Sequence, residues 1–183
     1  MVRKSHLSTH TINRRAYWEP EIFVQKSTTM LISYRPVEEK DLLFLKKVYR
    51  STREDELQLT GWDEAFKELF INQQFEAQHQ YYREVYHDAT FEVILLDGIP
   101  AGRLYLWESD NHIRIVDIAL LPEYRNQGAG RSILHELIRK SETTGKTLSI
   151  HVEAYNPALN LYKRLGFNQK DQTGVYFYME RTP

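Results

Sequence analysis

An apolar run that leads into a glycine-bracketed turn is the feature that most constrains the fold of this chain. Residues 115–121 are almost continuously apolar, Pro122 ends the run, and Gly128 and Gly130 frame the start of an amphipathic segment. Such a run is typical of a strand covered on both faces, and apolar positions at helical spacing indicate a helix. The segment therefore predicts a buried strand that turns into a helix, as in a mixed sheet flanked by helices.

The start of this helix, at Gly128, is a candidate anion site. The first N–H groups of a helix lack partners and carry a partial positive charge, so they bind anions where side chains leave room. Gly128 and Gly130 leave such room, and Arg125 adds a charge nearby. A plain turn that needs flexible residues explains the same glycines, so both interpretations stay open from the glycines alone.

Two other phosphate motifs do not fit the chain. A dinucleotide fingerprint requires a third glycine, but Arg131, Ser132 and Ile133 follow Gly130. The segment Gly145-Lys146-Thr147 resembles the end of a phosphate-binding loop, yet its first glycine would fall on Lys140, inside a helix.

The rest of the pattern predicts one α/β domain over residues 30–183 after a poorly patterned N-terminal extension, residues 1–29. Asp97-Gly98 is a two-residue hairpin signal, because both residues tolerate positive φ. Ser51 to Gly61 reads as a link between two helices, the second with an apolar stripe that includes Phe66, Leu69 and Tyr81. Expected strands cover 31–36, 91–96, 99–107, 113–121, 148–152 and 175–180, and expected helices begin near Leu42, Trp62, Gly128 and Asn156.

Composition excludes several classes of function. The 183 residues contain no cysteine, so thiolate metal sites and cysteine nucleophiles are excluded, and no His, Asp and Glu cluster predicts a metal site. A formal net charge of -1 disfavours nucleic acid as a partner. No segment is apolar for long enough to span a membrane, and no secretory signal is visible, so a cytoplasmic location is expected.

Two ordered motifs then resemble one family. The segment from Asp117 to Gly130, which ends in Arg125-Asn126-Gln127-Gly128-Ala129-Gly130, resembles the (Gln/Arg)-x-x-Gly-x-(Gly/Ala) signature of the GNAT superfamily of N-acetyltransferases. Downstream, the segment from Asn156 to Phe167 is similar to that family's Asn-x-Ala-x-x-Leu-Tyr-x-x-x-Gly-Phe block. The resemblance implies a single GNAT-type α/β domain with splayed strands at the cofactor site, and a transfer of acetyl from acetyl-CoA to a primary amine.

The resemblance also implies the residues that contact acetyl-CoA. Backbone groups of Ile118, Ala119 and Leu120 would pair with the pantetheine arm. Asn156 would touch the cofactor, although a helix-capping role explains it equally well. The pyrophosphate would lie on the amides of Arg125, Asn126, Gln127, Gly128, Ala129 and Gly130.

Tyr162 is the first candidate for a catalytic residue. The resemblance places it at the cofactor sulfur, where a phenol of pKa about 10 can protonate a thiolate whose thiol has a pKa of about 8.5. The N–H of Leu120 would stabilise the oxyanion. The alternative is a core tyrosine on an amphipathic helix.

The attacking amine must be neutral, so a base or a water chain is needed. His151 is the candidate base, because it lies five residues before Asn156, where some family members carry a carboxylate, and an ordinary histidine titrates near pH 6.5. Asp117, Glu153 and a structural role for His151 remain alternatives.

The acceptor is a small-molecule or peptide amine that the sequence does not identify, and a homodimer is left open. The family usually builds the acceptor pocket from the first two helices and their link, which points to Glu54, Asp55, Glu56, Trp62 and Tyr82. Acids there would attract a cationic amine, but a solvated helix surface explains them as well. A catalytically silent acetyl-CoA sensor is the alternative function.

Overall fold

The computed structural model describes residues 30–183, so the extension predicted over residues 1–29 lies outside the described part of the chain. Residues 30–183 form a seven-stranded sheet with the order β1-β2-β3-β4-β5-β7-β6. The elements in chain order are β1 (Ile32–Pro36), the 3-10 helix η1 (Glu39–Asp41), α1 (Leu42–Gln58), α2 (Glu64–Val85), β2 (Thr90–Leu96), β3 (Ile99–Glu108), β4 (His112–Leu120), the 3-10 helix η2 (Pro122–Tyr124), α3 (Ala129–Thr144), β5 (Thr147–Glu153), α4 (Leu159–Arg164), β6 (Asn168–Thr173) and β7 (Tyr176–Arg181).

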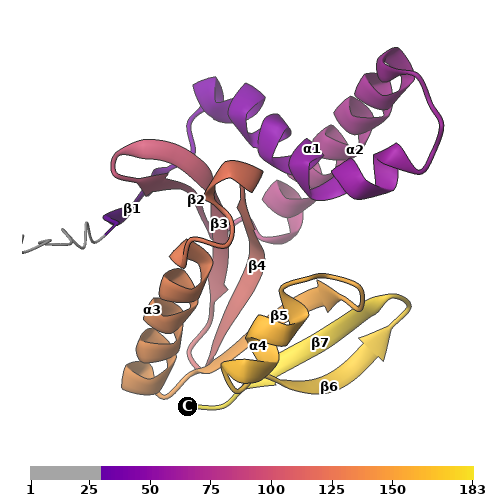
Figure 1. Ribbon diagram of the computed structural model, residues 1–183. Helices are drawn as coiled ribbons and strands as arrows, with labels where there is room; N and C mark the ends of the chain where they lie inside the picture. The colour runs from indigo at the N-terminus through magenta and orange to yellow at the C-terminus, as the bar shows by residue number, and fades with distance from the viewer. Residues whose placement is uncertain (1–29) are drawn as a thin grey trace, which may run out of the picture.

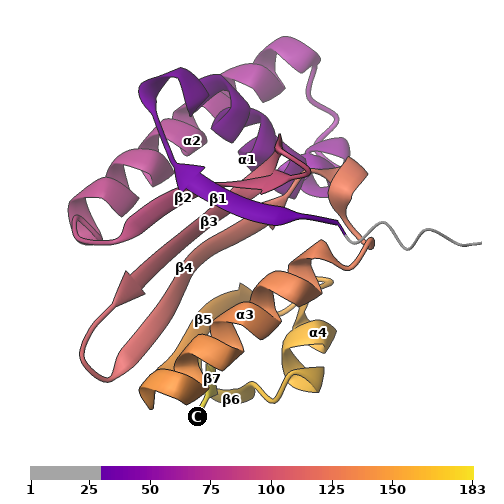
Figure 2. The same cartoon turned by 90° about the vertical axis from the view of Figure 1, so that its left-hand side faces the viewer.

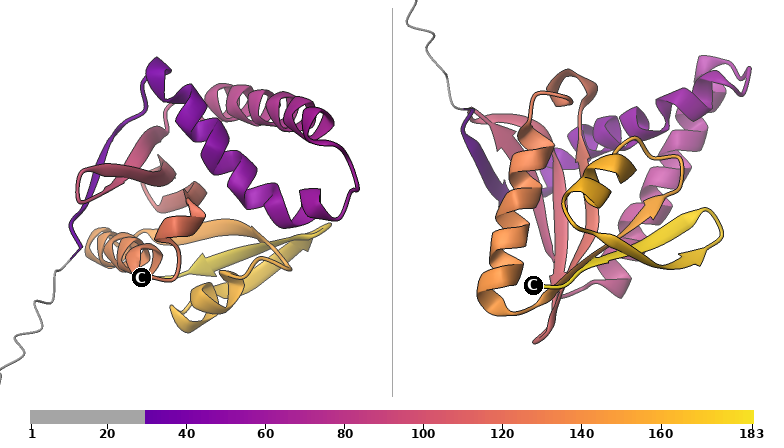
Figure 3. Two further views of the ribbon diagram at one scale, coloured as in Figure 1. Left: turned by 45° about the horizontal axis from the view of Figure 1, so that its top comes forward. Right: turned by 60° about the horizontal axis from the view of Figure 1, so that its bottom comes forward.

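The sheet lies between two layers of helices (Figures 1 and 2). Helices α1 and α2 lie on one face and α3 and α4 on the other, as the left view of Figure 3 also shows. Strands β4 and β5 run parallel, whereas the other neighbouring strands in residues 30–183 are antiparallel. This architecture confirms the expected α/β fold with a mixed sheet flanked by helices.

Two apolar clusters hold these layers together. One lies between the sheet and α3, where Ile133, Leu134 and Leu137 of the predicted helix face are buried. The other joins α1 to α2 and includes Leu45 and Phe75. Because burial of one large aliphatic or aromatic side chain contributes about 1.5–3 kcal/mol, the first cluster fixes α3 on the sheet and the second fixes α1 against α2.

Backbone conformations confirm the predicted turns at both ends of the sheet. Asp97 and Gly98 have φ of 51° and 81°, as a two-residue hairpin between β2 and β3 requires. Gly145 has a φ of 68° and ends α3.

The region of α1 and α2 differs from the sequence prediction in two respects. The expected link from Ser51 is helical through Gln58, because no helix breaker occurs before Gly61 and Arg50 pairs with Glu54 one turn later. The predicted stripe of α2 was also wrong. Its members Phe66, Leu69 and Tyr81 are about half exposed, whereas Ile71 and Phe75, on the other side, are buried.

Strand β6 is absent from the sequence prediction. Its six residues, Asn168–Thr173, are all exposed and none is apolar, because an edge strand pairs on one side only and covers no core here. Helix α4 begins at Leu159, later than the predicted cap at Asn156, because a turn precedes it. Within residues 30–183, no helix has both the length and the apolar character that a membrane span requires.

Candidate active site

Strands β4 and β5 separate after a short paired stretch, which opens the sheet at its centre (Figure 1). Their pairing runs from His112 with Thr147 to Ile115 with Ile150, and both strands continue beyond it. The β3–β4 register explains the divergence. Tyr105 pairs with Asp117 and Leu106 with Ile115, so Val116 is an extra residue in β4. Such a bulge bends and twists its strand, and it does so at the point where β4 leaves β5.

Beyond the bulge, the backbone N–H and C=O groups of successive β4 residues point alternately towards β3 and away from it. The N–H of Leu121 donates to the carbonyl of Ala101 in β3 at 2.9 Å. Because N–H and C=O groups alternate sides along a strand, Ala119 also faces β3, whereas Ile118 and Leu120 face the opening between β4 and β5. Of the three residues expected to contact pantetheine, Ile118 and Leu120 therefore present backbone groups to this opening, and Ala119 does not.

Gly102 holds β3 close to this part of β4. A Cβ atom on Gly102 would lie 2.1 Å from the carbonyl oxygen of Ala119. Gly102→Ala is therefore expected to push β4 away from β3 and to lower the free energy of unfolding by about 1–3 kcal/mol, as overpacking does. Urea unfolding would measure the loss.

Gly130→Ala is the matched control for that substitution. Within residues 30–183, its Cβ would meet Leu120 Cδ1 alone, at the ordinary distance of 3.9 Å, and we expect no loss of stability. Equal unfolding free energies for Gly102→Ala and the wild type would show that the two strands are not held together by this contact.

The turn between β4 and α3 has the geometry of an anion cradle. Asn126 and Gly128 have φ of 58° and 91°, and α3 begins at Ala129, so the amides of this segment converge at the helix N-terminus. A Cβ on Gly128 would meet no atom of residues 30–183 within 4 Å. Gly128 is thus required for its positive φ, and the space in front of it is open.

The side chain of Arg125 points away from this turn. Its Nε donates to the carbonyl of Leu120 at 2.7 Å, and one Nη donates to the Oγ of Ser51 in α1 at 2.9 Å and to its carbonyl at 3.1 Å. Burial of the guanidinium lowers the pKa of Arg125. Its charge therefore joins the turn to the end of β4 and to α1, and the turn itself offers its amides.

Tyr162 lies in α4, next to the opening. Its ring is 4% exposed and packs against Phe167, with 5.6 Å between ring centroids. Burial, and secondarily the charge of Asp117 in β4, raises the pKa of Tyr162, so its hydroxyl stays protonated at neutral pH. Burial and the charge of Asp117 are the influences on this hydroxyl, and no hydrogen bond to another group of residues 30–183 contributes. The proton is thus available to a ligand.

Asn156 forms a turn ahead of α4. Its Oδ1 accepts the N–H of Ala158 at 2.8 Å, and its carbonyl accepts the N–H of Leu159 at 3.0 Å. The side-chain carbonyl is thus used in capping, and the amide Nδ2 is the group left for a ligand.

His151 lies at the apex of the divergence. It directly follows Ile150, the last residue of β5 that pairs with β4. Its ring packs against Tyr178 of β7, with 4.8 Å between centroids, and Nδ1 lies 3.0 Å from an Nη of Arg114 in β4. Burial and the charge of Arg114 lower the pKa of His151, while Asp171 opposes the shift. His151 is thus neutral at pH 7, as a base must be.

The two alternative bases are held by arginines. Asp117 bonds to an Nη of the buried Arg103 at 2.7 Å. Glu153 bonds to Arg53 of α1 at 2.8 Å, and the hydroxyl of Tyr176 donates to it at 3.2 Å. Both carboxylates are therefore engaged in ion pairs, whereas His151 has no carboxylate partner among residues 30–183.

The residues expected to shape an acceptor pocket are dispersed. Glu54 and Glu56 pair with arginines of α1, as a solvated helix surface would, and Trp62 packs on Phe66 with 4.8 Å between centroids. Tyr82 is the exception, since it lies near Asp117, and burial raises its pKa.

Sequence reasoning missed Arg103 and Arg114. The pair of Arg103 with Asp117 had a signal in the sequence. Each is a charged residue in an otherwise apolar strand, and the two strands are neighbours. No local pattern identified Arg114, because its contacts come from β5 and from the end of α2.

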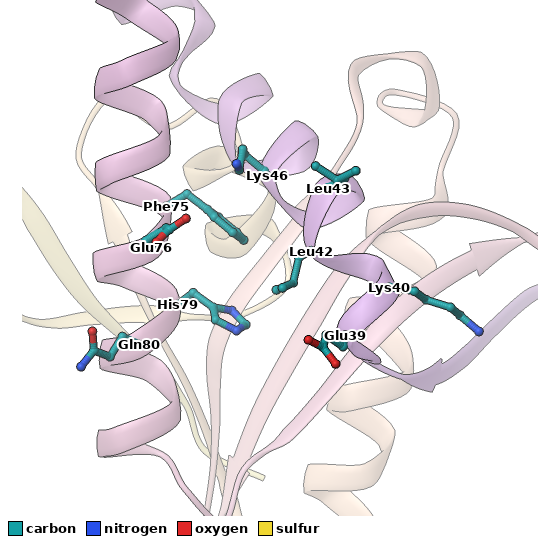
Figure 4. A pocket seen from close by; sticks show the side chains of 9 residues that line it. All are labelled: Glu39, Lys40, Leu42, Leu43, Lys46, Phe75, Glu76, His79 and Gln80. Atoms are coloured by element: carbon teal, nitrogen blue, oxygen red, sulfur yellow. The ribbon is translucent and has the colours of Figure 1, made fainter.

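A separate cavity of about 670 Å³ lies between η1, α1 and α2, with Phe75 and His79 directed towards Leu42 (Figure 4). None of the site residues expected from the sequence lines it. It therefore lies apart from the candidate active site.

Comparisons with known proteins agree with this geometry. The family model described as "Acetyltransferase (GNAT) family" matches residues 52–167, which is more than half of the chain. A coenzyme A complex of the PaiA N-acetyltransferase from Thermoplasma acidophilum has the same fold. Its TM-score is 0.63 at 22% identity, and the match covers 84% of this chain and 100% of that one.

Curated relatives match a shorter stretch. The chain is 44% identical over 57 residues to the [ribosomal protein bS18]-alanine N-acetyltransferase of Escherichia coli strain K12, which is 30% of this chain and 38% of the relative. It is 36% identical over 64 residues to the protein of the same name from Haemophilus influenzae, 34% of this chain and 44% of the relative. The matches thus span less than half of these relatives. The splayed strands, the glycine turn and the family match together show that the chain belongs to the Acetyltransferase (GNAT) family.

Proposed function

We propose that this protein transfers the acetyl group of acetyl-CoA to a primary amine, by direct transfer while both substrates are bound. The observation that carries the proposal is the divergence of β4 and β5 after Ile115 and Ile150, with Tyr162 beside it and the positive-φ turn at Gly128 ahead of it. This arrangement offers a thioester substrate an unpaired strand edge, an anion cradle and a proton donor. Family membership supports the same reading.

Backbone groups would hold acetyl-CoA. Ile118 would offer its N–H and C=O groups to the pantetheine arm and Leu120 its N–H, since the Leu120 carbonyl accepts Arg125 Nε. The amides of Asn126, Gln127, Gly128, Ala129 and Gly130 would bind the pyrophosphate. Arg125 positions this turn through Ser51 and Leu120, and Asn156 offers Nδ2. Acetyl-CoA supplies the activated acetyl group, and the protein orients it.

Tyr162 would protonate the leaving group. As the amine nitrogen bonds to the acetyl carbon, the C–S bond breaks and the departing thiolate needs a proton. A phenol whose pKa is raised by burial holds that proton until the thiolate develops. The N–H of Leu120 faces the same opening and would stabilise the charge on the acetyl oxygen.

His151 would accept the proton of the attacking amine. Because burial and Arg114 lower its pKa below the ordinary value of about 6.5, the neutral form is the active one above that pKa. We expect kcat/KM to fall as the pH decreases through the lowered pKa.

The matched variant is His151→Gln, which keeps a polar side chain but cannot take up a proton. It should lower kcat/KM and abolish the acidic limb of its pH profile, measured between about pH 5 and 8. If the acidic limb persisted in His151→Gln, the base would be another group, with Asp117 or a water molecule next in order.

The first acceptor to test is a protein N-terminus that begins with alanine, because the relatives above are named for alanine acetylation on a ribosomal protein. A thiol-release assay with acetyl-CoA would compare alanine-initiated peptides, lysine peptides, polyamines and amino acids. Turnover of any amine supports acetyl transfer. Binding of acetyl-CoA without turnover across the whole panel would instead make the protein a catalytically silent sensor.

A further inference from the structure

Arg114 is a partly buried arginine that has no carboxylate partner among residues 30–183. Arg35, Arg53 and Arg103 each pair with a carboxylate at 2.6–2.8 Å. Arg114 instead contacts Nδ1 of His151 at 3.0 Å and lies 5.5 Å from the centre of the Tyr86 ring. Among residues 30–183, these two contacts of Arg114 are with neutral groups, so its charge is left free to pair with an anion from outside the chain.

A cavity of about 390 Å³ opens beside Arg114. Its other walls come from Trp107 in β3 and from the end of α2 and the turn that follows, with the residues Val85, Tyr86, His87 and Asp88. Trp107 and Arg114 are cross-strand partners, so their side chains lie on one face of the sheet. Asp88 shares the cavity but is not within 4.0 Å of Arg114. The volume suits an amino-acid side chain or a free amino acid.

The contact between Arg114 and His151 also determines which ring nitrogen can act. A guanidinium has only donors, so Nδ1 of His151 must be the acceptor, and the neutral ring carries its proton on Nε2. The lone pair that a base would use is therefore occupied by Arg114. His151 can take a proton at Nδ1 only when Arg114 turns away.

We propose that Arg114 determines acceptor specificity: it binds a carboxylate of the acceptor in this cavity and thereby frees Nδ1 of His151. This inference rests on the proposed acetyl transfer. The N–C bond forms as the C–S bond breaks, the amine proton passes to Nδ1, and Tyr162 protonates the thiolate. Water then takes the proton of His151 and returns one to Tyr162. The carboxylate is that of an acidic residue near a peptide N-terminus or that of a free amino acid.

The test is a set of alanine-initiated peptides with Asp, Asn or Lys at position 2, 3 or 4, together with free amino acids and their amides. Acetylation is followed by thiol release. We expect the wild type to prefer Asp over Asn, or the acid over its amide, by about 10-fold or more in kcat/KM, the size of a charge-assisted hydrogen bond. Arg114→Gln should abolish that preference, and Arg114→Glu should shift it to Lys at the same position.

Arg139→Gln is the matched control, because Arg139 is exposed on α3, on the opposite face of the sheet. It removes the same charge and should keep the preference. A second measurement needs no variant. In the wild type, the imidazole nitrogen resonances of His151 should change when the preferred acidic acceptor binds, and should stay unchanged with its amide counterpart.

This inference would be overturned if peptides and amino acids were acetylated but the preference for the acidic acceptor did not depend on Arg114. The proposed acetyl transfer would then remain intact. Unchanged His151 resonances on binding of an acidic acceptor would overturn it as well. Failure of every amine in the panel would instead contradict the proposed function itself, on which the inference rests.

Discussion

Tyr162→Phe is expected to lower kcat by about 100-fold and to leave the affinity for CoA almost unchanged, since general acid catalysis contributes about that much or more. No hydrogen bond of this hydroxyl to residues 30–183 contributes to its environment, so the phenylalanine ring fits the same buried site without loss of an internal hydrogen bond. In the proposed mechanism, the substitution removes only the proton donor for the departing thiolate. Steady-state kinetics would give kcat, and calorimetry with CoA would give the dissociation constant.

Tyr34→Phe is the control for this substitution. It also removes a tyrosine hydroxyl, which donates to Glu136 at 2.8 Å across β1 and α3, away from the divergence of β4 and β5. We expect its kcat to equal that of the wild type. A kcat of Tyr162→Phe within about 2-fold of the wild type would remove Tyr162 from the mechanism and leave it as a core residue.

Gly128→Glu is expected to weaken CoA binding by about 100-fold or more. The added carboxylate would stand in the open space in front of the α3 N-terminus, where it would repel the pyrophosphate and could itself bond to the free amides. The positive φ of 91° adds strain. Isothermal titration with CoA would measure the change in affinity.

The same helix supplies a matched control at its other end. Gly145 also has a positive φ, 68°, and its Cβ would also meet nothing within 4 Å in residues 30–183. Gly145→Glu therefore introduces a similar strain and the same charge, and we expect CoA affinity to be retained although stability decreases. Equal loss of CoA affinity in both variants would mean that strain in α3, and not occupation of the cradle, explains the effect.

Much of the fold was predictable because its signals are local. The Asp97-Gly98 turn, the glycine that ends α3 and the apolar run of β4 each follow from the conformational preferences of a few adjacent residues. Strand β6 gave no such signal, because an exposed edge strand with polar residues on both faces has no alternation to detect. The buried face of α2 was misjudged because both sides of that helix carry apolar residues, and only packing against α1 selects one.

The features of the candidate site also divide into those that the sequence predicted and those that only the structure revealed. The order and spacing of the motifs from Asp117 to Gly130 and from Asn156 to Phe167 pointed to an acetyl-CoA cradle, because a positive-φ turn before a helix needs glycine at a set position. The bulge at Val116, the direction of the Arg125 side chain and the contact between Arg114 and His151 were not visible, since they join residues of different elements.

By itself, therefore, the sequence determined the class of fold and the glycine turn, because backbone conformation and helix periodicity depend on residues close in the chain. Only the tertiary structure decided that β4 leaves β5 after Ile115, that Ala119 faces β3, and that Arg114 occupies the Nδ1 of His151. Those features depend on strand register and on charges from separate elements, which approach one another only when the chain is folded.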